Sequence, residues 1–184
     1  TEETDISACP GRILAESIVA SENVPPFDRS PYDGYAFRSA DSVNASRENP
    51  VTLRILEEVP AGAVPTMTVT PGTATKILTG APIPEGADAG PQFERTEFTA
   101  ETVTLFSPAK PGENIVVIGE DVKKGAVLAE GGVRIDPGVA GTLAAQGIAR
   151  PRVYRVPRVG ILSTGNEVVE VGEALGAGKI YNSN

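Results

Sequence analysis

Stretches of β-branched, aromatic and other apolar residues recur through the middle of the chain, and each predicts a β-strand. In residues 51–55 apolar and polar residues alternate, as on a strand that is buried on one face. The short polar segment that ends at Glu101 predicts a hairpin. Residues 28–118 are therefore expected to form a β-rich unit. The other predicted strands lie at residues 35–38, 73–78, 102–106 and 114–118.

One α-helix is predicted, at residues 136–147. Asp136 can accept hydrogen bonds from the free amides at the start of the helix, and Pro137 suits its first position. Gly147 suits the position just after its end. Residues 11–20 are apolar enough to be buried, but the segment is too short for periodicity to choose between helix and strand.

Residues 159–162 form a continuous apolar run, typical of a strand buried on both faces of a parallel sheet. The small polar residues that follow would lie at the carboxyl end of that strand, where free amides can bind an anion. A parallel neighbour needs a crossover of a dozen or more residues. We therefore expect residues 159–184 to begin an α/β domain whose remainder is absent, and to be poorly ordered or covered by another chain. Before this run, four arginines in residues 150–158 favour a solvated connecting arm over a phosphate contact.

The composition excludes several classes of function. A net charge of −8 over 184 residues argues against a general nucleic-acid or membrane-surface binder, and no apolar run approaches the ~20 residues that span a bilayer. The single cysteine, Cys9, fits a reducing compartment. The chain has no histidine, which removes histidine bases, histidine-assisted nucleophiles and histidine metal sites. Any metal must then be a hard, oxygen-binding cation such as Mg²⁺, or a metal oxyanion.

Two loops carry the candidate chemistry. In residues 25–38 several prolines fix the backbone, and Asp33-Gly34 predicts a tight turn because glycine accepts a positive φ. This loop would present Ser30, Tyr32 and Asp33 together. A second loop, residues 79–88, places Thr79 beside Gly80 at the end of a strand. Taken alone, each loop is more often an ordinary turn than a binding site.

Six stretches taken together resemble the molybdopterin molybdenumtransferase family, which includes MoeA and the E domain of gephyrin. Any one of them would be weak, whereas the ordered series covers nearly the whole chain. They are residues 11–16, 26–36, 78–89, 119–125, 143–149 and 163–167.

The resemblance implies an elongated, multi-domain protein of mixed α+β class. Residues 1–27 and 119–156 would form a first domain, split around an inserted β-rich domain at residues 28–118. Residues 157–184 would be the truncated start of an α/β, parallel-sheet domain that binds the pterin. A small β-barrel domain ends the chain in the family.

The resemblance also implies a reaction in molybdenum cofactor biosynthesis. The family inserts molybdenum from molybdate into adenylylated molybdopterin and releases AMP, with Mg²⁺. Asp33, Thr79 and Glu167 match family positions and are the expected catalytic residues. Asp33 and Glu167 are candidates for orienting Mg²⁺ or water, and Thr79 for holding substrate. The expected substrate-binding residues are Ser30, Gly34, Gly80, Ser163, Thr164, Gly165 and Asn166.

In the family the site lies between the subunits of a homodimer, where the second domain of one subunit faces the third domain of the other. We therefore expect a cytoplasmic homodimer that works with an adenylyl-transferring enzyme of the same pathway, without nucleic-acid or membrane partners. These 184 residues alone are expected to be inactive. Two alternatives stay open: a non-catalytic assembly or scaffold module on the same fold, and a small anion-binding β-rich protein.

Overall fold

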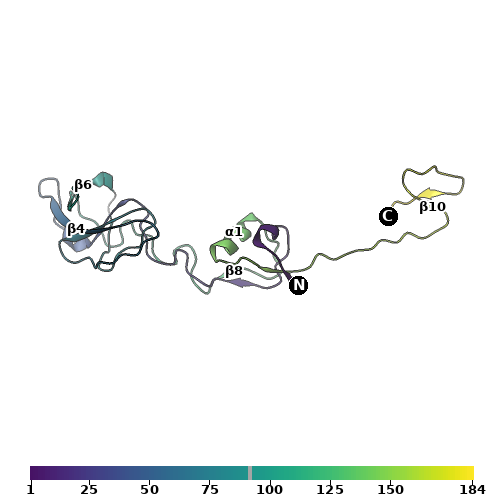
Figure 1. Ribbon diagram of the computed structural model, residues 1–184, viewed down its shortest axis with the longest axis horizontal. Helices are drawn as coiled ribbons and strands as arrows, with labels where there is room; N and C mark the ends of the chain where they lie inside the picture. The colour runs from purple at the N-terminus through teal and green to yellow at the C-terminus, as the bar shows by residue number, and fades with distance from the viewer. Residues whose placement is uncertain (91–92) are drawn as a thin grey trace.

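The computed structural model describes residues 1–90 and 93–184, and these residues are mostly β with one α-helix. The chain is drawn out along one axis, with a five-stranded sheet at one end, the helix near the middle and the C-terminal segment at the other end (Figure 1). The predicted elongated shape is thus present. The predicted fold class is confirmed in part: the structure is mostly β, and the mixed α+β class stays a prediction. Within the described ranges, no helix is long and apolar enough to cross a membrane.

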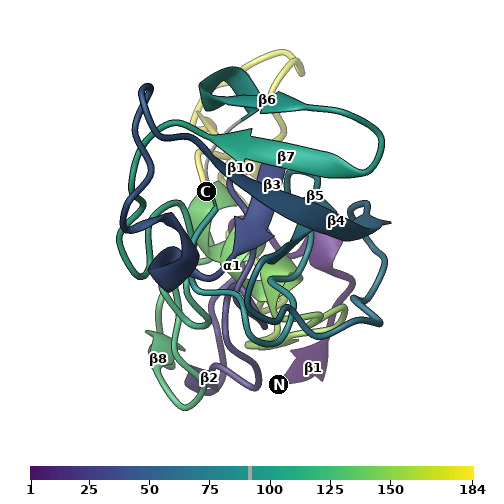
Figure 2. The ribbon, with the colours of Figure 1, turned by 90° about the vertical axis from the view of Figure 1, so that its left-hand side faces the viewer.

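The five-stranded sheet has the order β3-β5-β4-β7-β6 (Figure 2). Neighbouring strands are antiparallel except β4 and β5, which are parallel. Four predicted strands are confirmed here, as is the hairpin at Glu101, which joins β6 to β7. The confirmed strands are β3 (Gly34–Phe37), β4 (Val51–Val59), β5 (Thr73–Ile77) and β7 (Thr102–Leu105), and the sheet also contains β6 (Thr96–Phe98).

Alternation along the strands divides the apolar side chains between the two faces of this sheet. Tyr35 and Phe37 pack on one face with Leu53 and Val103, whereas Ala36 packs on the other. Both faces are therefore buried along β3. Short 3-10 turns at Ser39–Ser42 (η2) and Phe93–Arg95 (η3) flank the sheet.

Two sequence predictions in this region are wrong. Residues 114–118 do not form a strand in the described structure, because only an isolated bridge joins Val116 to Arg29. The tight turn predicted at Asp33-Gly34 is also absent from these described residues. Gly34 is instead extended and begins β3, because it pairs with Ile77 of β5.

The helix lies against two small antiparallel sheets. One pairs β1 (Glu2–Glu3) with β9 (Arg152–Val153), and the other pairs β2 (Ile18–Val19) with β8 (Val127–Ala129). A 3-10 turn, η1 (Ile6–Ala8), packs beside the helix. Residues 11–20 are thus extended rather than helical. Together with the helix they form what we call the helix unit, whose core contains Cys9, Leu14, Ile18, Ile135, Leu143 and Val153.

The helix α1 (Pro137–Ala145) begins and ends as predicted. Asp136 has an extended backbone, and its Oδ1 accepts from Val139 N at 2.8 Å. At the other end Gly147 has a φ of +71° and its N–H donates to Ala144 O. Ile148 N donates to Leu143 O, which completes a Schellman motif.

A pair of antiparallel segments, residues 20–29 and 116–126, joins the helix unit to the five-stranded sheet (Figure 1). We call this pair the neck. Its backbone pairs at four places: Ala20 with Ala126, Val24 with Val122, Pro25 with Gly119, and Arg29 with Val116. The domain limits proposed from the sequence stay a prediction.

The C-terminal segment differs from the expected buried strand. Val159, Ile161 and Leu162 are 78%, 72% and 87% exposed, and residues 159–162 pair with no other described residue. No neighbouring strand lies beside this run among the described residues, so neither of its faces is covered. The parallel pairing occurs later, between β10 (Val168–Val169) and β11 (Ile180–Tyr181). The assignment of residues 157–184 to a truncated α/β domain stays a prediction.

Candidate functional site

Asp33 and Thr79, which belong to different loops, meet at one end of the five-stranded sheet. Asp33 directly precedes β3, and Thr79 follows β5 by two residues. The antiparallel pairing of Gly34 with Ile77 brings these strand ends together. Asp33 Oδ1 accepts two hydrogen bonds from Thr79, one from its backbone N and one from Oγ1, each at 2.7 Å. The structure therefore joins two of the three predicted catalytic residues.

The Thr79 loop is a β-turn, in agreement with the simpler of its two interpretations. Ala81 N donates to Leu78 O at 2.9 Å, and Gly80 has a φ of +84°. A positive φ at the third position of the turn identifies it as type II and explains the glycine. The turn is thus the element that aims the Thr79 donors at Asp33.

The buried Ser30 connects the two loops through backbone hydrogen bonds. It is 3% exposed, and its backbone accepts from Gly80 N at 2.8 Å and donates to Ala81 O at 3.0 Å. Its hydroxyl donates to Tyr32 O. Ser30 therefore holds the shape of the site. The substrate-binding roles of Ser30, Gly34 and Gly80 stay predictions.

The Asp33 carboxylate is exposed and ionised at neutral pH. The two hydrogen bonds from Thr79 lower its pKa, the backbone bond contributing most, and the nearby Lys76 ammonium lowers it further. Among the described residues, Oδ2 of Asp33 accepts no hydrogen bond. This oxygen can therefore accept from a substrate or bind a cation.

Thr79→Val tests this account of the carboxylate. The variant removes the hydroxyl donor but keeps the backbone N–H, which is the larger cause of the lowered pKa. We expect the pKa of Asp33 to rise by less than half of the way back to its ordinary value, as measured by NMR titration of the carboxyl carbon. Thr66→Val, which removes a donor to Glu57 instead, should leave the pKa of Asp33 unchanged. No rise in Thr79→Val would contradict the assignment.

A cavity of about 610 Å³ lies on the face of the sheet that carries Tyr35, and neither Asp33 nor Thr79 is among its lining residues. Phe93 links the two places, because its N–H donates to Asp33 O at 3.2 Å and its ring packs on Tyr35. Lys76 pairs with Tyr35 across the strands, and its Nζ lies 2.8 Å from Glu58 Oε2. The cavity is lined by Tyr35, Ile55, Leu56, Glu57, Glu58, Lys76, Phe98, Thr99 and Ala100.

The sequence pattern did not single out these cavity residues. Two of them lie near the candidate loops in the sequence: Tyr35 comes two residues after Asp33, and Lys76 comes three residues before Thr79. The sequence offers no other local indication of these residues. This proximity becomes informative only once the register of β3 with β5 is known.

The buried hydroxyl of Tyr35 leads to a prediction about stability. The Tyr35 ring is fully buried, and its hydroxyl has no hydrogen-bond partner among the described residues. Burial also raises the pKa of this hydroxyl. Since an unpaired buried polar group is destabilising, we expect Tyr35→Phe to raise the free energy of unfolding by about 1 kcal/mol in urea denaturation. A loss of stability of similar size would show that the hydroxyl is paired.

The third predicted loop lies far from this pair. Glu167 directly precedes β10, at the opposite end of the molecule from the five-stranded sheet (Figure 1). Gly165 has a φ of +145°, a backbone conformation that residues with a side chain rarely adopt, which explains the glycine. Ser163 Oγ donates to Asn182 Oδ1 at 2.8 Å, whereas Thr164 and Asn166 are exposed. Within one chain, Glu167 and its loop do not join Asp33.

The residues that could bind metal are few. In the part of the chain that the structure describes, no three acidic or cysteine side chains converge on one point. Asp33 supplies one carboxylate and Thr79 one hydroxyl, both hard oxygen donors. Mg²⁺ commonly takes one or two carboxylates and completes its shell with phosphate oxygens and water. These donors therefore fit Mg²⁺ as a partial site, and the choice between Asp33 and Glu167 stays a prediction.

Comparison with known proteins supports the family resemblance. The family model described as "MoeA N-terminal region (domain I and II)" matches residues 1–147. A molybdopterin molybdenumtransferase of Bacillus subtilis (strain 168) is 48% identical over 177 residues, covering 94% of this chain and 41% of the relative. One from Staphylococcus aureus (strain Mu50 / ATCC 700699) is 43% identical over 172 residues, with 94% and 41% covered. The chain thus spans less than half the length of these relatives.

Solved structures agree. The crystal structure of the molybdopterin biosynthesis MoeA protein from Pyrococcus horikoshii aligns with a TM-score of 0.89 and 41% identity, covering 98% of this chain and 46% of that one. A crystal structure of a molybdopterin biosynthesis MoeA protein from Pyrococcus horikoshii OT3 aligns with a TM-score of 0.85 and 42% identity, covering 94% of this chain and 46% of that one. In sequence and in fold, the chain belongs to the MoeA family and corresponds to its N-terminal region.

Proposed function

We propose that this chain carries one half of the active site of a molybdopterin molybdenumtransferase. The proposed reaction inserts molybdenum from molybdate into adenylylated molybdopterin and releases AMP. The family and the names of the relatives support this assignment. The observation that carries it is the Asp33 carboxylate, which Thr79 holds with two hydrogen bonds and which keeps one oxygen free at the surface.

Each residue at this end of the sheet has a proposed role. Asp33 presents a fixed negative charge to the substrate, and Thr79 orients that carboxylate. Mg²⁺ bound beside Asp33 would neutralise the phosphate of the departing AMP. Lys76 offers a cation to an anionic group of the substrate, and the half-exposed Phe98 ring offers an apolar wall for a flat ring.

The second half of the site is proposed to come from another subunit. Glu167 lies at the far end of the same chain, which supports a site completed across an interface between two copies (Figure 1). This arrangement needs a homodimer in which the sheet of one subunit faces the Glu167 loop of its partner. The split first domain, the inserted domain, an adenylyl-transferring pathway partner and a cytoplasmic location remain parts of the proposal.

A chimera tests the proposal. Residues 1–184 replace the matching part of the Bacillus subtilis relative, and the chimera is expressed in a strain that lacks that protein. We expect it to restore molybdenum insertion, measured as AMP release from adenylylated molybdopterin in the presence of molybdate. The 184-residue chain alone should release none. A chimera that folds but restores no activity would overturn the proposal.

The two alternatives, a scaffold module and a small anion-binding protein, make different predictions. A scaffold would keep its partner binding in Asp33→Ala and Thr79→Ala, and neither substitution would matter to its function. A small anion-binding protein would bind molybdate as the isolated chain, without the remaining domains. Titration of the isolated chain with molybdate, AMP and Mg²⁺ measures this directly.

A further inference from the structure

The neck contains a break in its backbone pairing. Ala20 pairs with residues 125 and 126, and Val24 pairs with Val122, but the backbone groups of residues 21–23 find no backbone partner among the described residues. Exposed backbone groups of this kind are either solvated or bonded by side chains. A two-stranded connection bends most easily where its ladder is interrupted, so this break is one natural bending point between the sheet and the helix unit.

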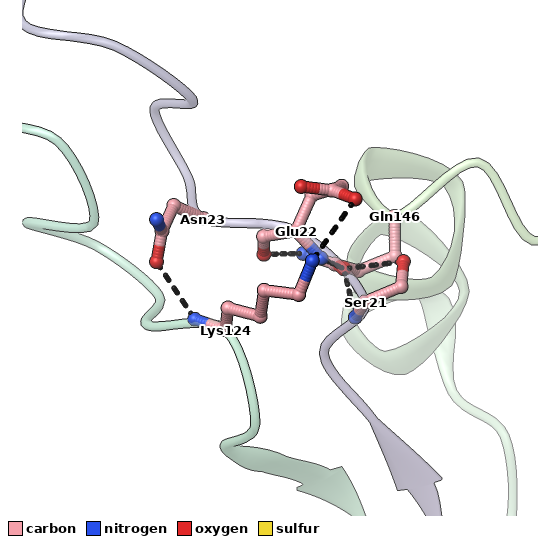
Figure 3. Close-up of polar contacts among 5 residues, drawn as sticks. All are labelled: Ser21, Glu22, Asn23, Lys124 and Gln146. Atoms are coloured by element: carbon pink, nitrogen blue, oxygen red, sulfur yellow. Dashed lines mark hydrogen bonds and ion pairs between the residues drawn. The ribbon is translucent and has the colours of Figure 1, made fainter.

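Gln146 at the C-terminal end of α1 fills one side of the break (Figure 3). Its Oε1 accepts from Ser21 N at 2.9 Å, from Glu22 N at 3.1 Å and from Ser21 Oγ at 3.3 Å. Its Nε2 donates to Glu22 O at 3.1 Å. The side-chain amide therefore pairs with both backbone groups of Glu22, as a neighbouring strand would.

Asn23 fills the other side (Figure 3). Its Oδ1 accepts from Lys124 N at 2.8 Å, and Lys124 Nζ lies 3.5 Å from Glu22 Oε1. Contacts thus run without interruption from α1 through Gln146 to the outgoing segment, and from there to the returning segment. Both segments of the neck are tied to the end of one helix.

We infer that Gln146 is a positioning residue that sets the orientation of the Asp33–Thr79 pair relative to the helix unit. Beyond the neck, only the sheet carries this pair, so a change of angle at residues 21–23 moves the pair as a rigid group. The inference rests on the proposed function, because the orientation matters only if Asp33 must face a second half of the site. Its structural part can be measured without any substrate.

The experiment is a distance measurement between spin labels on the 184-residue chain, with Arg54→Cys in β4 and Gly141→Cys in α1. Both positions are exposed, whereas the native Cys9 is fully buried and its pKa is raised by burial, so it resists labelling. Gln146→Met keeps a side chain of similar shape without the hydrogen bonds. We expect it to broaden the distance distribution by about twofold or more. An unchanged distribution overturns the inference.

Thr142→Ala is the matched control, because the Thr142 hydroxyl bonds only within α1, to Gly138 O. Broadening in this variant as well would mean that helix stability is the cause and would overturn the role of Gln146. Hydrogen exchange of the unsubstituted chain gives a readout that does not depend on any variant. The amides of Ser21 and Glu22 should be protected, and free exchange at both would also overturn the inference.

Turnover separates this inference from the proposed function. In the chimera, Gln146→Met should lower the rate of AMP release by about tenfold or more while the pKa of Asp33 stays unchanged, since the chemistry is intact but misplaced. A folded chimera that releases no AMP refutes the proposed function, and the spin-label distances on the 184-residue chain still test the positioning role. A variant of Gln146 with normal turnover refutes the positioning role alone.

Discussion

Asp33→Asn is expected to lower molybdenum insertion by the chimera on the order of 100-fold or more, with the fold retained. The asparagine oxygen can still accept both hydrogen bonds from Thr79, so the loop keeps its shape. What is lost is the negative charge, which an aspartate carries at every pH near neutrality. The measurement is the initial rate of AMP release at saturating molybdate.

A matched control is available in the same part of the chain. Asp41 also accepts a backbone hydrogen bond, from Gly72 N at 3.0 Å, but it does not contact the Asp33–Thr79 pair. Asp41→Asn should therefore leave the rate unchanged. Equal rates for the two asparagine variants would show that the Asp33 charge has no part in the reaction.

Gly86→Ala is expected to cause the largest loss of stability of any substitution considered, about 3 kcal/mol in the free energy of unfolding. Gly86 has a φ of +87°, and a Cβ there would lie 2.1 Å from Val69 O. Relief of that overlap requires the backbone of Val69, a buried residue, to move away from Glu85 O, to which its N–H donates at 2.8 Å. Urea denaturation followed by circular dichroism gives the value.

Gly72→Ala separates the two causes of this loss. Gly72 has a similar φ of +77°, but a Cβ there would have no described atom within 4 Å. The variant should therefore lose only the cost of the left-handed backbone, about 1 kcal/mol. Equal losses at the two positions would mean that the contact with Val69 has no energetic effect.

Local patterns in the sequence located four strands of the five-stranded sheet and the only α-helix of the described residues. Runs of apolar and β-branched residues predicted these strands, and Asp136, Pro137 and Gly147 predicted both ends of α1, because each of these signals acts within a few residues. The apolar run at residues 159–162 is a local signal of the same kind. Its apolar residues indicate burial, but burial needs a covering surface, and these residues are exposed in this chain.

The candidate site was predictable only in parts. Asp33 and Thr79 were chosen separately, by resemblance to a family. Their contact depends on the register of Gly34 with Ile77, which neither loop encodes alone. Gly34 itself was expected in a turn, yet cross-strand pairing outweighs the turn tendency of an Asp-Gly sequence. The role of Gln146 was not visible either, since its partners lie over 120 residues earlier in the chain.

The pairing of β1 with β9 has a consequence for how the chain folds. Glu2 faces Val153 and Ile18 faces Ala129, so the helix unit can close only after the whole intervening sheet has been synthesised. Joining such distant segments carries a large loop-closure entropy. The five-stranded sheet reduces that cost if it folds first, because the neck then holds residues 20 and 126 together. The five-stranded sheet, which is synthesised completely before residue 153, would then also fold before the helix unit closes.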